Sequence, residues 1–370
     1  MSRALILLLL IPWAAMPARA ADAELDAWLQ KHGVAESGDA MATRPGWQPP
    51  RRIVVDAVLP QIVEQLREAA PEAEIVAVRS AAEMAQAVAG AEVAIGRRNI
   101  VCSDAVLAAG TALRWVQVYS AGIEGCGDKA AFADRSILLT NMRAVAGPVM
   151  ADHTMGMLLA LTRGLHVSIP RQAAGNWDDD YPGVTLQGLE GGTMLIVGLG
   201  GIGMEVARRA HAFGMRVVAT RATRQAKPEF VDYVGLADEL PALIGAADVI
   251  VHTAPLTPAT RGLFDRAMFA RMKPGAIFIN VARGAAVDTH ELIAALQSGR
   301  LGGAAVDVTD PEPLPADHPL WQAPNIIITP HMSGSAVGDI QMRLRVLREN
   351  LRRYVAGERM LAVADPARGY

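Results

Sequence analysis

Residues 193–203 read TMLIVGLGGIG, and the architecture of the chain follows from them. An apolar strand, 194–197, enters a glycine-rich turn, and a helix-like stretch, 204–213, follows. In this setting glycines permit a tight turn, close approach of a pyrophosphate, and close packing of helix on strand. The helix N-terminus also favours an anion. The alternative is a plain tight turn between strand and helix. The candidate dinucleotide-binding residues are Gly198, Gly200, Gly201, Ile202 and Gly203.

The same stretch opens the more regular of two series of alternating strands and helices. Short apolar runs recur between helical stretches, which is the pattern of parallel strands covered on both faces. An earlier series begins at residue 51. The sequence therefore predicts an α/β fold with two parallel sheets. The expected strands are 53–55, 75–78, 93–96, 115–119 and 137–140, then 194–197, 216–219, 249–252, 277–280, 304–308 and 326–329.

Three further segments flank or join these series. A helix is expected over about 147–166, and its apolar stripe is best explained as core or interface. Residues 21–50 form an N-terminal arm, with a short helix over 22–32 and a linker over 33–50 that is rich in glycine, proline and polar residues. A C-terminal helix is expected over about 334–357, and its arginines are interpreted as a solvated face.

The strand after the glycine turn bears on the choice of dinucleotide. An NAD site places an acid there, about 20 residues after the turn, to bind the ribose hydroxyls. This chain has no acid there and instead carries Arg221, 18 residues after Gly203, and Arg224. An arginine attracts the extra phosphate of NADP, so NADP is expected to be preferred, with NAD possible. The alternative is that both arginines are solvated surface residues.

Three polar residues follow later apolar runs and form a candidate catalytic set. The planar fork of Arg283 suits a bidentate grip on a carboxylate and can polarise a ketone. His331 can give a proton to a developing alkoxide. Glu312, on a proline-rich loop, can stabilise the imidazolium form of a neighbouring histidine. Taken alone, Arg283 could also be a surface arginine, His331 a structural histidine and Glu312 a solvated loop residue.

Composition bounds the remaining possibilities. The chain has 370 residues, 51% of them hydrophobic, which is enough for two domains with their own cores. Its net charge of −3 and lack of a basic block argue against nucleic acid as a partner. No histidine–cysteine cluster suggests a metal. Cys102 and Cys126 could form one disulfide, but two unpaired thiols are expected.

The first twenty residues are expected to be a Sec-type signal peptide. Arg3 is a short positive region, 4–15 an apolar region too short to span a bilayer, and 18–20 a cleavage site of small residues. The prediction is export to the periplasm, with no stable membrane anchor after cleavage. The alternative is a misassigned start, with translation from Met16 or Met41 and a cytoplasmic protein.

Taken together, the motifs resemble those of the D-isomer-specific 2-hydroxyacid dehydrogenases. The resemblance covers about residues 52–357. Besides the glycine turn it rests on APLTPATRGL (254–263), NVARG (280–284), GGAAVDV (302–308), EPLP (312–315), HPLW (318–321) and TPHMSG (329–334). It implies two doubly wound parallel-sheet domains. A Rossmann cofactor domain, 148–334, would be inserted into a flavodoxin-like substrate domain, 51–147 plus 335–370.

The resemblance also implies roles for individual residues. Arg283 would bind the substrate carboxylate and carbonyl, and Glu312 would pair with the acid/base His331. The cofactor would be held by Pro255, Thr260, the Ala282 carbonyl, Asp307 and His331, besides the glycine turn and the two arginines. Backbone N–H groups of Ser120, Ala121 and Gly122 would bind the substrate carboxylate, with Arg98 near the substrate. A homodimer through the long helix region is implied.

The leading hypothesis is thus an NADP-preferring reductase of small 2-oxo acids that yields the D-2-hydroxy acid. Two departures from the family pattern stand out: Arg221 where many members carry aspartate, and a signal peptide in a family that is ordinarily cytoplasmic. A second hypothesis is a non-catalytic nucleotide-binding sensor or scaffold of the same fold. A third is an exported binding protein that no longer uses a dinucleotide.

Overall fold

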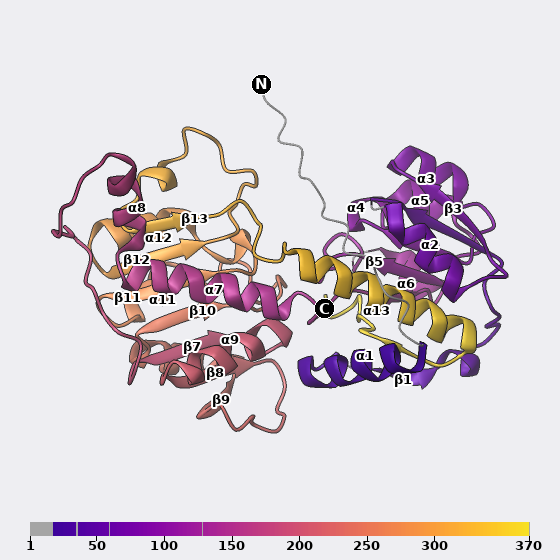
Figure 1. Ribbon diagram of the computed structural model, residues 1–370, viewed down its shortest axis with the longest axis horizontal. Coiled ribbons are helices and arrows are strands. Elements are labelled where there is room, and N and C mark those ends of the chain that lie inside the picture. The colour runs from indigo at the N-terminus through magenta and orange to yellow at the C-terminus, as the bar shows by residue number, and fades with distance from the viewer. Residues whose placement is uncertain (1–17, 35, 59, 128, 370) are drawn as a thin grey trace.

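The computed structural model describes residues 18–34, 36–58, 60–127 and 129–369, arranged in two lobes that each contain a parallel sheet (Figure 1). The chain forms most of the first lobe, crosses to the second, and returns to the first at its C-terminal end. Residues 1–17 of the expected signal peptide lie outside the described residues. No helix in the described part is long and apolar enough to cross a membrane.

The first lobe holds a five-stranded sheet in the order β3-β2-β4-β5-β6, with all neighbours parallel. Strands β2, β4 and β5 are buried almost throughout, because helices cover both faces. This is the flavodoxin-like strand order. The strands are β2 (Arg52–Asp56), β3 (Glu74–Val78), β4 (Val93–Gly96), β5 (Trp115–Val118) and β6 (Leu138–Thr140), and the helices α2 (Pro60–Ala69), α3 (Ala81–Ala87), α4 (Arg98–Val101), α5 (Asp104–Ala109) and α6 (Ala130–Asp134).

The second lobe holds a seven-stranded parallel sheet in the order β13-β12-β11-β10-β7-β8-β9. The chain leaves β7 toward β8 on one side and resumes at β10 on the other. In sheets of this kind the ligand crevice lies outside the carboxyl ends of the two strands at such a point, here β7 and β10. The strands are β7 (Thr193–Val197), β8 (Arg216–Arg221), β9 (Tyr233–Leu236), β10 (Val249–His252), β11 (Ala276–Asn280), β12 (Leu301–Val306) and β13 (Ile326–Ile328), and the helices α9 (Gly201–Ala212), α10 (Leu240–Leu243), α11 (Arg266–Arg271) and α12 (Thr289–Gln297).

Every expected strand is present, and in the second sheet one further strand, β9, was not anticipated. Its sequence is Tyr-Val-Gly-Leu, and it lies at the edge of the sheet with Tyr233 exposed. An edge strand needs fewer apolar residues than a covered one, so β9 lacks the continuous run that marks its neighbours.

Helix α7 (Gly147–Thr162) leads from the first lobe into the second and packs against α9. The expected helix over 147–166 ends early, because Gly164 adopts a left-handed φ of +67°. The chain then turns into α8 (Leu165–Ala173). A side chain at position 164 would also collide with Tyr181. Apolar side chains of α7, among them Met155 and Leu158, are buried in the core, as expected.

The N-terminal arm is more ordered than the sequence indicated. Helix α1 (Ala18–His32) lies alongside α13 (Val337–Ala356) (Figure 1). The linker prediction for 33–50 is wrong for β1 (Glu36–Ala40), which pairs antiparallel with β14 (Arg359–Leu361). Its sequence, Glu-Ser-Gly-Asp-Ala, has no apolar run, so only the partner strand defines it.

The arginines of α13 do not form the solvated face that was expected. Arg345 pairs with Glu24 of α1 at 3.3 Å, and Arg353, whose side chain is only 10% exposed, pairs with Glu36 of β1. The arm also reaches the second lobe, where His32 Nδ1 lies 2.9 Å from Glu205 Oε1. Helix α13 therefore anchors the arm, and the arm contacts both lobes.

Cys102 and Cys126 form a disulfide, with their Cα atoms 5.2 Å apart, so the expectation of two free thiols is wrong. Cys102 ends α4, and Cys126 lies in the loop after β5. The cysteines are 24 residues apart in sequence. They meet because β4 and β5 are neighbours in the sheet and both loops leave from the same edge.

Candidate functional site

The glycine turn has the local geometry that a dinucleotide requires. Gly198 has a φ of +104°, and a Cβ there would lie 2.6 Å from the Ala254 backbone. A Cβ on Gly203 would lie 2.4 Å from the carbonyl oxygen of Gly198. Nothing lies within 4 Å of the Cβ position of Gly200, which caps α9. The turn is thus tight where it packs and open where a pyrophosphate would approach, so the residues fit the cofactor.

Arg221 lies beside this turn. It ends β8, and its Nη2 donates to the Leu199 carbonyl at 2.8 Å while Nη1 donates to Gln225 Oε1 at 3.1 Å. Burial lowers the pKa of its guanidinium. Arg224, three residues on, is exposed. The structure therefore places Arg221, more than Arg224, next to the candidate phosphate-binding turn.

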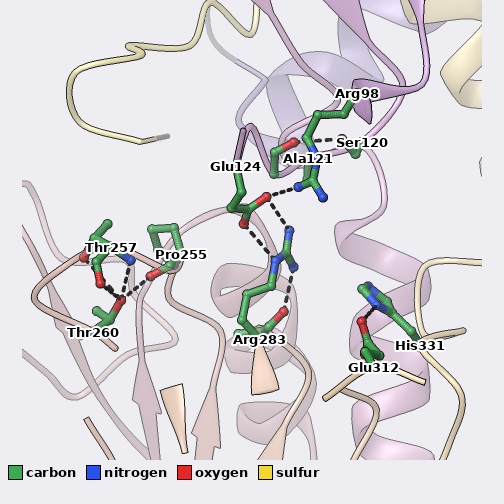
Figure 2. A network of polar contacts seen from close by, with 12 residues as sticks. Arg98, Ser120, Ala121, Glu124, Pro255, Thr257, Thr260, Arg283, Glu312 and His331 are labelled. Atoms are coloured by element: carbon green, nitrogen blue, oxygen red, sulfur yellow. Dashed lines mark hydrogen bonds and ion pairs between the residues drawn. The ribbon is translucent and has the colours of Figure 1, made fainter. Parts of the chain in front are cut away.

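The loop after β10 forms a second wall of the crevice. Thr260 Oγ1 donates to the Pro255 carbonyl at 2.7 Å and accepts from the Thr257 N–H at 2.8 Å (Figure 2). His252, the last residue of β10, is fully buried against Phe264. Burial lowers the pKa of His252 to about 3. It is therefore a neutral core residue, although it stands at the end of a strand.

Arg283 points from the second lobe into the gap between the lobes. Its Nε and Nη2 donate to the two carboxylate oxygens of Glu124 at 2.8 and 3.2 Å, and its Nη1 donates to the Ala282 carbonyl at 2.6 Å. Arg98 also bonds Glu124 (Figure 2). Arg98 thus belongs to the network around Arg283.

The loop Ser120–Gly122 faces Arg283 from the first lobe. Ser120 Oγ donates to the Gly122 carbonyl at 2.7 Å, and the Ala121 carbonyl accepts from Asn141 Nδ2 at 2.6 Å. A Cβ on Gly122 would lie 2.0 Å from Arg283 Nη2, so a side chain there would displace the guanidinium from its present position. A small ligand held by both elements would bind between the lobes.

His331 and Glu312 form a pair on the same side of the crevice as Arg283 (Figure 2). His331 Nδ1 lies 3.0 Å from Glu312 Oε2, and the side chains are 49% and 41% exposed. Because Glu312 engages Nδ1, the other ring nitrogen, Nε2, remains for a ligand. His331 has a left-handed φ of +49°, a conformation that a non-glycine residue keeps only when its surroundings impose it.

Asp307 imposes that conformation. Its buried carboxylate accepts the N–H groups of Met332 and Ser333 at 2.9 and 3.0 Å and the Thr329 hydroxyl at 2.6 Å. The His331 N–H donates to the Asp307 carbonyl at 2.8 Å. These contacts hold the turn that carries the histidine. His153 of α7 supports the same turn, with Nε2 3.1 Å from Thr329 Oγ1.

Two residues of this site were not singled out from sequence. Glu124 is a lone acid in a loop, and His153 is one polar residue in an apolar helix, so neither has a pattern of its own. Glu124 follows the Ser-Ala-Gly segment by two residues, and this was the only available signal.

Among the described residues, no group of histidine, cysteine and acidic side chains could hold a metal ion.

The fold and the site together define a nicotinamide-dependent dehydrogenase class: a glycine turn that fits a dinucleotide beside a histidine–carboxylate pair and an arginine. The model of the NAD-binding domain of D-isomer-specific 2-hydroxyacid dehydrogenases matches residues 155–333. The chain is 37% identical over 265 residues, 70% of its length, to glyoxylate/hydroxypyruvate reductase B of Citrobacter koseri, of which 80% is covered.

Solved structures of similar proteins support the same family. A D-isomer-specific 2-hydroxyacid dehydrogenase family protein from Aeromonas salmonicida has a TM-score of 0.72 and 32% identity, covering 85% of this chain and 99% of that one. An NADPH-dependent glyoxylate/hydroxypyruvate reductase from Sinorhizobium meliloti, solved with NADP and sulfate, has a TM-score of 0.72 and 25% identity, covering 86% and 99%. The chain belongs to the D-isomer-specific 2-hydroxyacid dehydrogenase family and is an NAD(P)-dependent oxidoreductase.

Proposed function

We propose that this protein is an NADPH-preferring reductase of small 2-oxo acids, such as glyoxylate or hydroxypyruvate, that yields the D-2-hydroxy acid. The observation that carries the proposal is the placement of Arg283 and the His331–Glu312 pair around the same crevice as the glycine turn. The names of the relatives supply the substrate class. The proposed substrate and cofactor domains, 51–147 plus 335–370 and 148–334, would close around the ligand.

Each residue then has a chemical task. When bound, the reduced nicotinamide supplies the hydride, and the Ala282 carbonyl is proposed to hold its carboxamide. The expected contact of Asp307 with the carboxamide is not proposed, because its buried carboxylate already accepts from Thr329, Met332 and Ser333 and holds the turn of His331 instead. Arg283 and the backbone N–H groups of Ser120–Gly122 bind the substrate carboxylate, and the guanidinium polarises the ketone. His331 donates the proton on Nε2 to the developing alkoxide, and Glu312 at Nδ1 stabilises the imidazolium before transfer.

The test uses the purified chain starting at Ala21. Loss of reduced-nicotinamide absorbance would be followed with NADPH and with NADH against glyoxylate, hydroxypyruvate, pyruvate and phenylpyruvate. Turnover with any of these acids supports the reductase. Tight dinucleotide binding without turnover on any oxo acid would favour a non-catalytic nucleotide-binding protein instead.

The cofactor preference rests on Arg221. We expect Arg221→Ser to raise the KM for NADPH about 10-fold or more, because one charge-assisted hydrogen bond to a phosphate contributes roughly 1.5–3 kcal/mol. The kcat/KM with NADH should change less than about 2-fold, which serves as the internal control. Arg224→Ser should have a smaller effect, since Arg224 is exposed. Equal losses with NADPH and NADH would contradict the assignment to the 2′-phosphate.

We also propose that the protein is exported to an oxidising compartment. The disulfide Cys102–Cys126 supports this, because such bonds persist outside the cytoplasm and are rare inside it. Thiol titration of the denatured protein, prepared from its native compartment without reductant, should find no free thiol. Two free thiols per chain would argue for a cytoplasmic protein.

A homodimer is proposed as the functional assembly. Helix α8 and the segment after it project from the second lobe (Figure 1). Four large apolar side chains of this part of the chain are exposed. A second copy of the chain is the proposed occupant of this surface, because burial of such side chains against a partner would remove their apolar area from water. The residues are Leu165, Ile169, Trp177 and Leu186. Sedimentation of the purified protein decides between monomer and dimer.

A further inference from the structure

The hydrogen bonds of Arg283 limit how it can meet a ligand. A guanidinium carries five N–H groups in a fixed plane. Glu124 accepts from Nε and from one N–H of Nη2, and the Ala282 carbonyl accepts from one N–H of Nη1. One N–H on Nη1 and one on Nη2 are left, and they lie side by side at the end of the fork. This pair is the edge that a carboxylate or ketone oxygen would meet.

Glu124 is well suited to hold the Arg283 guanidinium by the edge opposite the two remaining N–H groups. Both of its carboxylate oxygens are engaged, Oε1 by Arg283 and Oε2 by Arg283 and Arg98. Burial raises the pKa of Glu124, but attraction and hydrogen bonding from Arg283 outweigh it, so the net effect is a lowered pKa. The carboxylate therefore stays charged, and its bidentate contact fixes the plane of the guanidinium.

The loop that carries Glu124 is itself restrained. Gly122 contacts Arg283 so closely that a side chain there would displace the guanidinium, and Cys126 joins the loop to the end of α4. Helix α4 begins with Arg98, the second partner of Glu124. The first lobe thus presents Glu124 to an arginine that belongs to the second lobe, 159 positions away in sequence.

We propose that Glu124 is a positioning residue for the proposed reduction: it aligns Arg283 across the crevice so that the two remaining N–H groups face the substrate. This inference rests on the proposed function. Glu124 touches neither substrate nor cofactor in this account and acts only through Arg283. A competing role is a carboxylate that occupies Arg283 and must be displaced by the substrate; it would make Glu124 inhibitory.

The test compares Glu124→Gln and Glu124→Asp with the wild type, using the oxo acid on which the wild type is most active. Glu124→Gln should lower kcat/KM for the oxo acid about 10- to 100-fold, because its amide cannot accept two N–H groups from one fork. The KM for NADPH should not change. Glu124→Asp keeps the carboxylate and should recover part of the loss. The matched control is Glu291→Gln, because both carboxylate oxygens of Glu291 accept from Arg266, through Nε and Nη2, at a surface position.

A double-mutant cycle separates this role from a general effect on folding. Lysine has no planar fork to align, so adding Glu124→Gln to Arg283→Lys should cost less than about 3-fold. Independent, multiplicative losses, a wild-type kcat/KM in Glu124→Gln, or an increase in that variant would each overturn the proposal. The increase would establish the competing, inhibitory role.

A binding measurement covers the case in which the wild type reduces no oxo acid. That result alone would defeat the proposed function. Calorimetric binding of oxalate in the presence of NADPH would then decide the role of Glu124 separately. Weaker oxalate binding in Glu124→Gln than in wild type and Glu291→Gln supports the alignment of Arg283, and equal or stronger binding overturns it.

Discussion

Replacement of His331 by alanine should lower kcat for the oxo acid by at least about 10²-fold, because a positioned general acid contributes roughly 10²- to 10⁴-fold to such a step. The Nδ1 of His331 is held 3.0 Å from Glu312 Oε2, so the other ring nitrogen, Nε2, is the one left to deliver the proton. Because the His331 side chain is 49% exposed, its removal should leave the fold intact. Steady-state kinetics at saturating NADPH, with circular dichroism to check folding, measure the effect.

The matched control is His211→Ala. His211 is an exposed histidine near the end of α9, at the opposite end of that helix from the glycine turn. Its replacement should leave kcat within about 2-fold of wild type, as is usual for exposed positions. Dinucleotide affinity should survive in His331→Ala if the histidine serves mainly as acid. A His331→Ala enzyme with wild-type turnover would remove the residue from the catalytic set.

The second large effect is expected at Arg283. Arg283→Ala should lower kcat/KM for the oxo acid about 10²- to 10⁴-fold, because two charge-assisted hydrogen bonds at roughly 1.5–3 kcal/mol each are lost. Arg283→Lys should recover only a small part, since an ammonium group keeps the charge but not the fork. The measurement is kcat/KM for the oxo acid at saturating NADPH.

Arg266→Ala is the control for Arg283→Ala. Arg266 makes a bidentate ion pair with Glu291, but at an exposed surface position, where such pairs contribute little. Its loss should leave kcat/KM unchanged. If Arg283→Ala kept the wild-type kcat/KM for the oxo acid, the substrate-binding role would have to pass to another group, and Arg98 would be the first candidate.

The strands and the glycine turn were predictable because their signals are local. A buried parallel strand needs a continuous apolar run, and the turn needs glycines at fixed spacing between a strand and a helix. The exceptions show the limit of that logic. Strand β1 has no apolar run and exists through its pairing with β14, and His252 ends a strand yet faces the core rather than the crevice.

The sequence by itself determined the α/β class and predicted the dinucleotide turn and the candidate trio of Arg283, Glu312 and His331, because each lies in a short motif with a characteristic spacing. Only the tertiary structure decided what surrounds that trio. The Glu124–Arg283 contact, the Cys102–Cys126 bond and the hold of Asp307 on the histidine turn join residues that are far apart in sequence. Such contacts depend on how strands are ordered in the sheets and how the two lobes face each other, and no local pattern encodes that placement.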